Sequence, residues 1–168
     1  MQRVGKFEKV SFPRFEEAFR DSFDMSETEI KGVYDSIRLP KRATAGSAGY
    51  DFYTPVAIHL ESGQSALIPT GIRAKMDRDW VLMIYPRSGL GFKYRLQLNN
   101  TVGVIDSDYY NSDNEGHIFI KITNDSNEGK IVDVAAGGGF AQGIFMQYGI
   151  TEDDDVTEER NGGFGSTG

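Results

Sequence analysis

Short segments of alternating apolar and polar residues dominate the chain beyond about residue 34. Apolar residues occupy every second position in 72–77, and isoleucine does so in 118–123, which is the period of a half-buried β-strand. The run 80–85 is continuously apolar and predicts a strand buried on both faces, and 143–148 predicts another short strand. Turn residues separate these segments and no long helical pattern occurs, so the sequence predicts an all-β sandwich or barrel.

The first 38 residues follow a different, helical pattern. Phe15, Phe19 and Phe23 are spaced four apart, as on one face of a helix. The stretch Ser26-Glu27-Thr28-Glu29 is a capping box, in which Ser26 and Glu29 each satisfy a backbone N–H of the first helical turn. We therefore predict two short helices, each with one apolar stripe that packs against the main domain.

Composition favours one globular domain and argues against a nucleic-acid-binding or membrane-spanning protein. The chain has 168 residues, 39% of them hydrophobic, which suits one domain with a real core. A net charge of −7 argues against sequence-independent binding to nucleic acid, which needs a basic surface. No apolar run approaches the roughly 20 residues that span a bilayer, and the chain has no Cys and no apolar signal core at its start. We expect a cytoplasmic protein that binds neither nucleic acid nor membrane.

The same patterns divide the chain into three parts. We predict a helical N-terminal extension (1–38), a β domain (39–150), and an acidic linker with a glycine-rich C-terminal arm (151–168). The arm has little to bury, because a single Phe stands among glycines and hydroxyl residues.

Five segments carry side chains suited to a phosphate-bearing ligand: 46–52, 86–91, 99–110, 137–143 and 160–168. The second offers a guanidinium, a hydroxyl and backbone N–H groups at the end of a strand, which suits phosphate oxygens. It is not a P-loop, because the GxxxxGK[ST] spacing is absent. Taken alone, each segment has an ordinary structural explanation as a turn, a loop or, for the last, a disordered terminus.

Individual residues within these segments suggest chemical roles. Asp106 ends an apolar stretch, where its carboxylate can orient and deprotonate a water. Tyr109 offers a flat face to a sugar, and Gln142 can donate to a phosphate or a water. Phe164 is placed to stack on something planar, with Arg160 meeting anionic oxygens.

Taken in order, the five segments resemble the five motifs of the homotrimeric all-β dUTPases (dUTP diphosphatases), from about Leu39 to Gly168. The resemblance implies a jelly-roll-like β domain, a homotrimer, and active sites shared by three subunits. The tail of one chain would close over a pocket built by the other two. It implies hydrolysis of dUTP to dUMP and pyrophosphate, which supplies dUMP for thymidylate synthesis and keeps uracil out of DNA.

The resemblance also assigns residues. For the phosphate chain and the attacking water, it implies roles for Arg87, Ser88, Gly89, Gln142 and Asp106. For uracil and deoxyribose, it implies Asn100, backbone groups of Gly103, Val104 and Ile105, and the ring of Tyr109. For the tail, it implies a γ-phosphate contact from Arg160 and closure over uracil by Phe164, Gly165 and Ser166. Asp51 would help to organise Mg²⁺ through water, the ion being bound mainly by phosphate oxygens and waters.

Three features depart from the family pattern. The basic residue that the family usually has before Ala-Gln in the fourth segment is replaced near Gly139. Arg160 lies one residue closer to the Gly-Gly-Phe run than the matching residue does in many members of the family. The stretch 110–115 adds a polar insertion after Tyr109. Two other functions remain as alternatives: a dCTP deaminase of the same fold, and a non-catalytic trimer that binds a regulator through the N-terminal helices.

Overall fold

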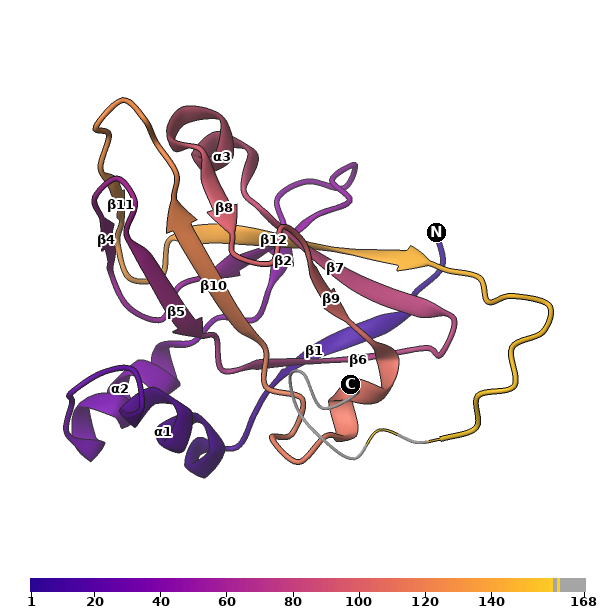
Figure 1. Ribbon diagram of the computed structural model, residues 1–168. Coiled ribbons are helices and arrows are strands. Elements are labelled where there is room, and N and C mark those ends of the chain that lie inside the picture. The colour runs from indigo at the N-terminus through magenta and orange to yellow at the C-terminus, as the bar shows by residue number, and fades with distance from the viewer. Residues whose placement is uncertain (159, 161–168) are drawn as a thin grey trace.

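The computed structural model of the chain describes residues 1–158 and 160 (Figure 1). The strands in this part are β1 (Gly5–Lys9), β2 (Lys41–Arg42), β3 (Tyr50–Tyr53), β4 (Ile58–Leu60), β5 (Ser65–Pro69), β6 (Ile72–Met76), β7 (Trp80–Pro86), β8 (Leu96–Leu98), β9 (Gly103–Ile105), β10 (Phe119–Asn124), β11 (Val132–Val134) and β12 (Gly139–Gln147). The helices are α1 (Phe12–Arg20), α2 (Glu27–Ser36), α3 (Ser88–Tyr94) and the 3-10 helix η1 (Ser107–Asn111).

Antiparallel sheets form the body of the molecule. The largest has the strand order β2-β3-β12-β7-β9, and a three-stranded sheet has the order β5-β10-β8. The pairs β1-β6 and β4-β11 complete the set. Inward residues of these sheets, such as Phe52, Leu82, Ile120 and Phe140, form one buried core. The all-β fold predicted from the alternating pattern is therefore confirmed.

The prediction that residues 80–85 are buried on both faces is wrong for the isolated chain. Leu82 and Ile84 lie in the core, whereas Met83 between them is only half-buried. On this outer face Met83 pairs with Val104, which is 52% exposed, and the same face continues to Met146, which is 45% exposed. The largest sheet thus has an apolar outer face that nothing in the chain covers among the described residues.

The two N-terminal helices begin as the sequence predicts. Ser11 caps α1, and Ser26 and Glu29 form the predicted capping box of α2. Phe15, Phe19 and Ile30 are fully buried in a second cluster between the helices and the β domain. The extension also contains an element that the pattern does not predict: β1, which pairs with β6 along its whole length.

The helical extension packs tightly on the turn between β5 and β6. Gly71 in this turn has φ +71°, and a Cβ added to it would lie 2.4 Å from Cδ1 of Ile37. Only glycine allows both this backbone conformation and this approach. In the described part of the chain, none of the helices has the length and apolar character needed to cross a membrane.

Candidate active site

Two predicted phosphate-site residues, Arg87 and Gln142, lie beside Asp51, the carboxylate predicted to organise Mg²⁺ through water, at one end of the largest sheet. Gln142 in β12 pairs with Asp51 of β3 on one side and with Tyr85 of β7 on the other. Arg87 follows β7, and its Nε lies 3.1 Å from Oδ1 of Asp51. The Gln142 amide donates to the carbonyl of Pro86 at 3.1 Å. We call Asp51, Arg87 and Gln142 the phosphate cluster.

Two expectations about this region are corrected by the backbone. Residues 86–91 are not a simple turn, because α3 begins directly after Arg87, at Ser88. The apolar run 143–148 predicts a strand that begins after Gln142, whereas Gln142 lies inside β12, which already begins at Gly139. A strand position fixes the Gln142 side chain more firmly than a loop before a strand does.

Two glycines, which have no side chain, make space for the side chains of the phosphate cluster. A Cβ on Gly139 would lie 2.9 Å from a terminal nitrogen of Arg87, and one on Gly49 would lie 2.5 Å from Oε1 of Gln142. Gly139 stands near the position where the family usually has a basic residue. Its missing side chain lets Arg87 lie against the backbone of β12, where Arg87 donates to the Gly139 carbonyl at 3.5 Å.

A second group of predicted residues surrounds η1. Asp106 follows β9, and a terminal nitrogen of Arg160 lies 2.6 Å from its Oδ2. The Arg160 Nε lies 3.0 Å from Oδ1 of Asp108, and the guanidinium carbon lies 5.6 Å from the centre of the Tyr109 ring. We call Asp106, Tyr109 and Arg160 the Asp106 group. Arg160 thus binds carboxylates of its own chain here.

The surroundings of Asp106 tune its basicity. Burial raises the pKa of its carboxyl group, the Arg160 guanidinium opposes this, and the neighbouring Asp108 adds to it, so that the pKa lies above its usual value. A carboxylate with a raised pKa is a stronger base while it is still ionised at neutral pH. This suits the predicted role of Asp106 in deprotonating a water.

Tyr109 is held at its phenol end by two hydrogen bonds. The residue is 3% exposed, and its hydroxyl donates to the carbonyl of His117 at 2.7 Å. The amide of Asn114 donates to the same hydroxyl at 2.8 Å. Neither His117 nor Asn114 was singled out from the sequence. The polar insertion after Tyr109 was the signal that pointed to this region.

The predicted uracil-binding residues lie along β9 and the turn before it. Asn100 is exposed in the turn between β8 and β9. Strand β9 (Gly103–Ile105) stands at the edge of the largest sheet, and within the described part of the chain it pairs with β7 only. An edge strand leaves the N–H and C=O groups on its outer side free of strand pairing. Such groups can form the hydrogen bonds that recognition of uracil requires.

The two groups lie far apart within one chain. Ile105 pairs with Leu82 near the start of β7, and Asp106 follows Ile105, whereas Arg87 comes after the end of β7. At about 3.3 Å per strand residue, the two groups are separated by roughly 20 Å. In Figure 1, α3 lies at one end of β7 and the short helix after β9 lies toward the other.

The remaining tail residues predicted to bind substrate, Phe164, Gly165 and Ser166, lie outside the described residues. Among residues 1–158 and 160, no group of three or more His, Asp or Glu side chains is gathered to hold a metal ion.

Known proteins are similar to this chain in fold and in sequence. A family model described as dUTPase matches residues 35–168. The deoxyuridine 5'-triphosphate nucleotidohydrolase of Lactococcus lactis subsp. lactis is 44% identical over 135 residues, which cover 79% of this chain and 89% of that protein. That of Tolumonas auensis is 38% identical over 156 residues, which cover 86% and 99%.

A crystal structure of dUTPase from Streptococcus mutans superposes with a TM-score of 0.63 at 35% identity, covering 87% of this chain and 98% of that one. These likenesses place the chain in a class of all-β nucleotide hydrolases. The chain belongs to the dUTPase family. The predicted family and fold are thus confirmed, and with them the enzyme class, a hydrolase of dUTP.

Proposed function

We propose that this protein hydrolyses dUTP to dUMP and pyrophosphate in active sites shared between copies of the chain. The separation of the phosphate cluster from the Asp106 group carries this proposal. A general base must lie within about 3 Å of the proton it takes, whereas roughly 20 Å of strand β7 separates Asp106 from Arg87 in one chain. One chain therefore supplies two half-sites, and a neighbouring copy supplies the complement to each.

The apolar outer face of the largest sheet supports an assembly of copies. Val104 and Met146 are about half exposed there, beside the half-buried Met83. Exposed apolar surface of this kind is typical of protein interfaces. Closed rotational symmetry lets every chain use its two half-sites, and a homotrimer, as the family resemblance implies, satisfies this requirement.

In the proposed reaction, Asp106 accepts a proton from a water, whose oxygen forms a bond to the α-phosphorus. The bond from the α-phosphorus to the bridging oxygen breaks, and pyrophosphate leaves with its electron pair. Arg87 and Gln142, with Ser88 and the backbone at Gly89, bind the phosphate oxygens. Hydrogen bonds of this charge-assisted kind are the stronger ones in proteins.

The ring of Tyr109 supports the deoxyribose in this proposal, and its close packing leaves no space for a 2′-hydroxyl. Asn100 and the outer edge of β9 bind uracil. Selectivity for a deoxyuridine nucleotide therefore comes from the Asp106 side of the shared site, whereas the phosphate side binds any triphosphate.

The phosphate cluster fits Mg²⁺ bound mainly by the substrate. This ion keeps several waters and usually takes one or two carboxylates plus phosphates. Asp51 supplies a single carboxylate, already paired with Arg87, which fits contact through water. Bound Mg²⁺ would neutralise charge on the phosphate chain.

Arg160 exchanges partners in this scheme. In the isolated chain it pairs with Asp106 and Asp108, and in the proposed reaction this guanidinium would have to leave before a water could bind to the Asp106 carboxylate. The γ-phosphate is the competing anion, and its binding would free Asp106 to act as a base.

Mixing two inactive variants tests the shared site. Asp106→Asn removes the base, and Arg87→Ala removes the phosphate contact. When the two proteins are unfolded together and refolded, about a quarter of the sites in random symmetric assemblies combine an intact Asp106 with an intact Arg87. We expect about that fraction of wild-type pyrophosphate release. A mixture that stays as inactive as its components contradicts sharing, and each variant refolded alone is the control.

Substrate choice is tested in parallel. Pyrophosphate release from dUTP, and not from dCTP, is expected. Release of ammonia from dCTP would instead support the deaminase of the same fold.

A further inference from the structure

The polar insertion after Tyr109 connects the Asp106 group to the N-terminal extension. We propose that Asn114, Glu115 and Ser11 form a brace that holds the Tyr109 ring in position and thereby sets the preference for deoxyribose over ribose. The proposal rests on the sugar-binding role proposed for Tyr109. Glu8 and Ser11 lie before residue 35, where the family match begins.

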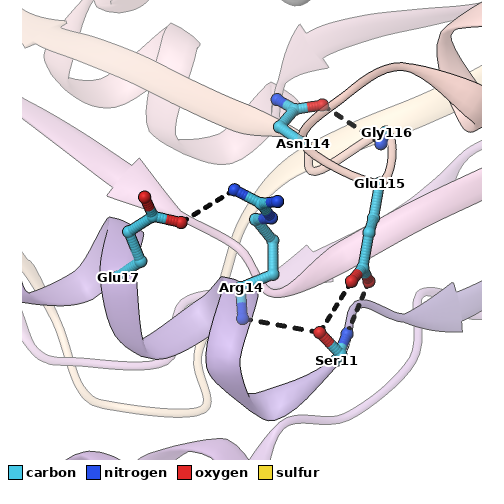
Figure 2. A network of polar contacts seen from close by, with 6 residues as sticks. All are labelled: Ser11, Arg14, Glu17, Asn114, Glu115 and Gly116. Atoms are coloured by element: carbon cyan, nitrogen blue, oxygen red, sulfur yellow. Dashed lines mark hydrogen bonds and ion pairs between the residues drawn. The ribbon is translucent and has the colours of Figure 1, made fainter.

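Asn114 is the inner end of the brace. Its amide nitrogen donates to the Tyr109 hydroxyl at 2.8 Å. Its amide oxygen accepts from the Ser112 hydroxyl at 2.7 Å. The same oxygen accepts from the Gly116 N–H at 3.1 Å, as Figure 2 shows. Because both ends of this amide are bound, Asn114 transmits the position of the insertion to the Tyr109 hydroxyl.

Glu115 is the outer end of the brace. Its carboxylate accepts from the backbone N–H of Ser11 at 2.8 Å and from the Ser11 hydroxyl at 2.7 Å, as Figure 2 shows. Glu115 has φ +60°, a backbone conformation that costs a non-glycine residue energy and persists only where its surroundings impose it. The double contact with Ser11 supplies such a constraint.

Ser11 is itself fixed, because it is the N-cap of α1 and accepts from the N–H of Arg14. Helix α1 is in turn anchored by Phe15 and Phe19, which are fully buried. The carboxylate of Glu115 is therefore bound to a rigid helix terminus and not to a loose chain end.

The first residue of the insertion is held by the same part of the chain. The Tyr110 hydroxyl donates to Glu8 of β1. The Tyr110 carbonyl accepts from Arg73 of β6 at 2.7 Å, and the guanidinium carbon of Arg73 lies 3.6 Å from the centre of the Tyr110 ring. Both ends of the insertion thus contact the N-terminal segment, and Tyr109 lies directly before it.

The test compares kcat/KM for dUTP with kcat/KM for UTP in three variants: Asn114→Ala, Glu115→Gln and Ser11→Ala. A looser Tyr109 ring admits a 2′-hydroxyl. We therefore expect the dUTP/UTP ratio to fall by about 5- to 10-fold in Asn114→Ala, the size of one hydrogen bond, and by about 3-fold in the other two. The change should appear in KM for dUTP and in faster use of UTP, with kcat for dUTP nearly constant.

Two further variants test whether Ser11 and Glu115 act together and whether the loss of a negative charge alone changes the ratio. The double variant Ser11→Ala with Glu115→Gln should lower the ratio by less than the product of the two single effects, because both changes weaken the one contact between these residues. Glu128→Gln removes an exposed carboxylate that pairs only with Lys130 among the described residues, and the ratio should stay at its wild-type value.

Thermal unfolding distinguishes a brace from general stabilisation. Ser11→Ala also removes the cap of α1 and lowers the melting temperature, whereas Glu115→Gln leaves the cap in place. A lower melting temperature with an unchanged dUTP/UTP ratio in Asn114→Ala and Glu115→Gln overturns the proposal. Tyr109→Ala distinguishes failure of the brace from failure of the proposed sugar site. If Tyr109→Ala changes the dUTP/UTP ratio while Asn114→Ala and Glu115→Gln do not, only the brace is wrong. If Tyr109→Ala also leaves the ratio unchanged, the proposed sugar site itself is wrong.

Discussion

The buried imidazole of His117 makes the stability of this protein depend on pH. The side chain is fully buried between the β domain and α1, near the ring of Phe15. Its Nε2 accepts from the N–H of Gly71 at 2.8 Å, so the neutral ring carries its proton on Nδ1, which has no hydrogen-bond partner among the described residues. Protonation of Nε2 would remove this bond and bury a charge.

The size of the effect follows from the pKa of this ring. Burial lowers the pKa of His117 from 6.5 to about 4, against a smaller raising effect of Glu115. The unfolded chain therefore takes up a proton near pH 6.5, and the folded chain only near pH 4. Stability is complete above pH 6.5 and falls as the pH drops toward 4. The loss is about 2 kcal/mol per chain by pH 5 and about 3 kcal/mol by pH 4.

Urea unfolding at pH 7.5, 6, 5 and 4, at one subunit concentration, measures this loss. Carboxylates also titrate in this range, so the informative quantity is the difference between the wild type and His117→Gln, which keeps an acceptor for Gly71 but cannot be protonated. The variant should lose about 2 kcal/mol less by pH 5. His59→Gln, a change at the exposed second histidine, is the matched control and should follow the wild type. Parallel pH profiles for the wild type and His117→Gln would refute the reasoning.

Three further outcomes are expected. Asp106→Asn should lower turnover by about 10²–10⁴ with binding of a non-hydrolysable dUTP analogue retained; near-normal pyrophosphate release would exclude Asp106 as the base. Arg160→Ala removes the cation that lowers the pKa of Asp106, so the acid limb of the kcat/KM profile should move to higher pH; an unmoved limb would show that the ion pair does not form in the active enzyme. Deletion of residues 160–168 should abolish most activity without changing the assembly state, and a monomeric product in light scattering would contradict the shared site.

Strands with strong alternation could be predicted from the sequence, whereas elements that depend on tertiary pairing could not. The segment 118–123 shows its period directly and becomes most of β10. Strand β1 contains a single large apolar residue, Phe7, among charged neighbours, and it is stabilised by pairing with β6. Helix α3 contains two glycines, which disfavour a helix. It ends at Tyr94 and is capped by Arg95, whose N–H bonds back to the carbonyls of Leu90 and Gly91.

The identity of the candidate site residues could be taken from the order of the motifs, but their arrangement could not. Sequence order alone does not show that Asp106, after β9, and Arg87, after β7, lie beside opposite ends of β7. It also does not show that Arg160 contacts Asp106 within the chain, because that contact depends on the path of residues 148–158. Asn114 and Glu115 belong to no motif, since the roles proposed for them arise from contacts with Tyr109 and Ser11.

The open apolar face of the largest sheet has a consequence for biosynthesis. In the assembly of copies proposed above, a newly synthesised chain exposes Val104 and Met146, beside the half-buried Met83, until other copies cover them, and during that interval the face is open to aggregation. The net charge of −7 gives each new chain a repulsive field that opposes unproductive collisions. The same field slows productive encounters, so higher ionic strength should speed maturation of the enzyme while making its aggregation more frequent.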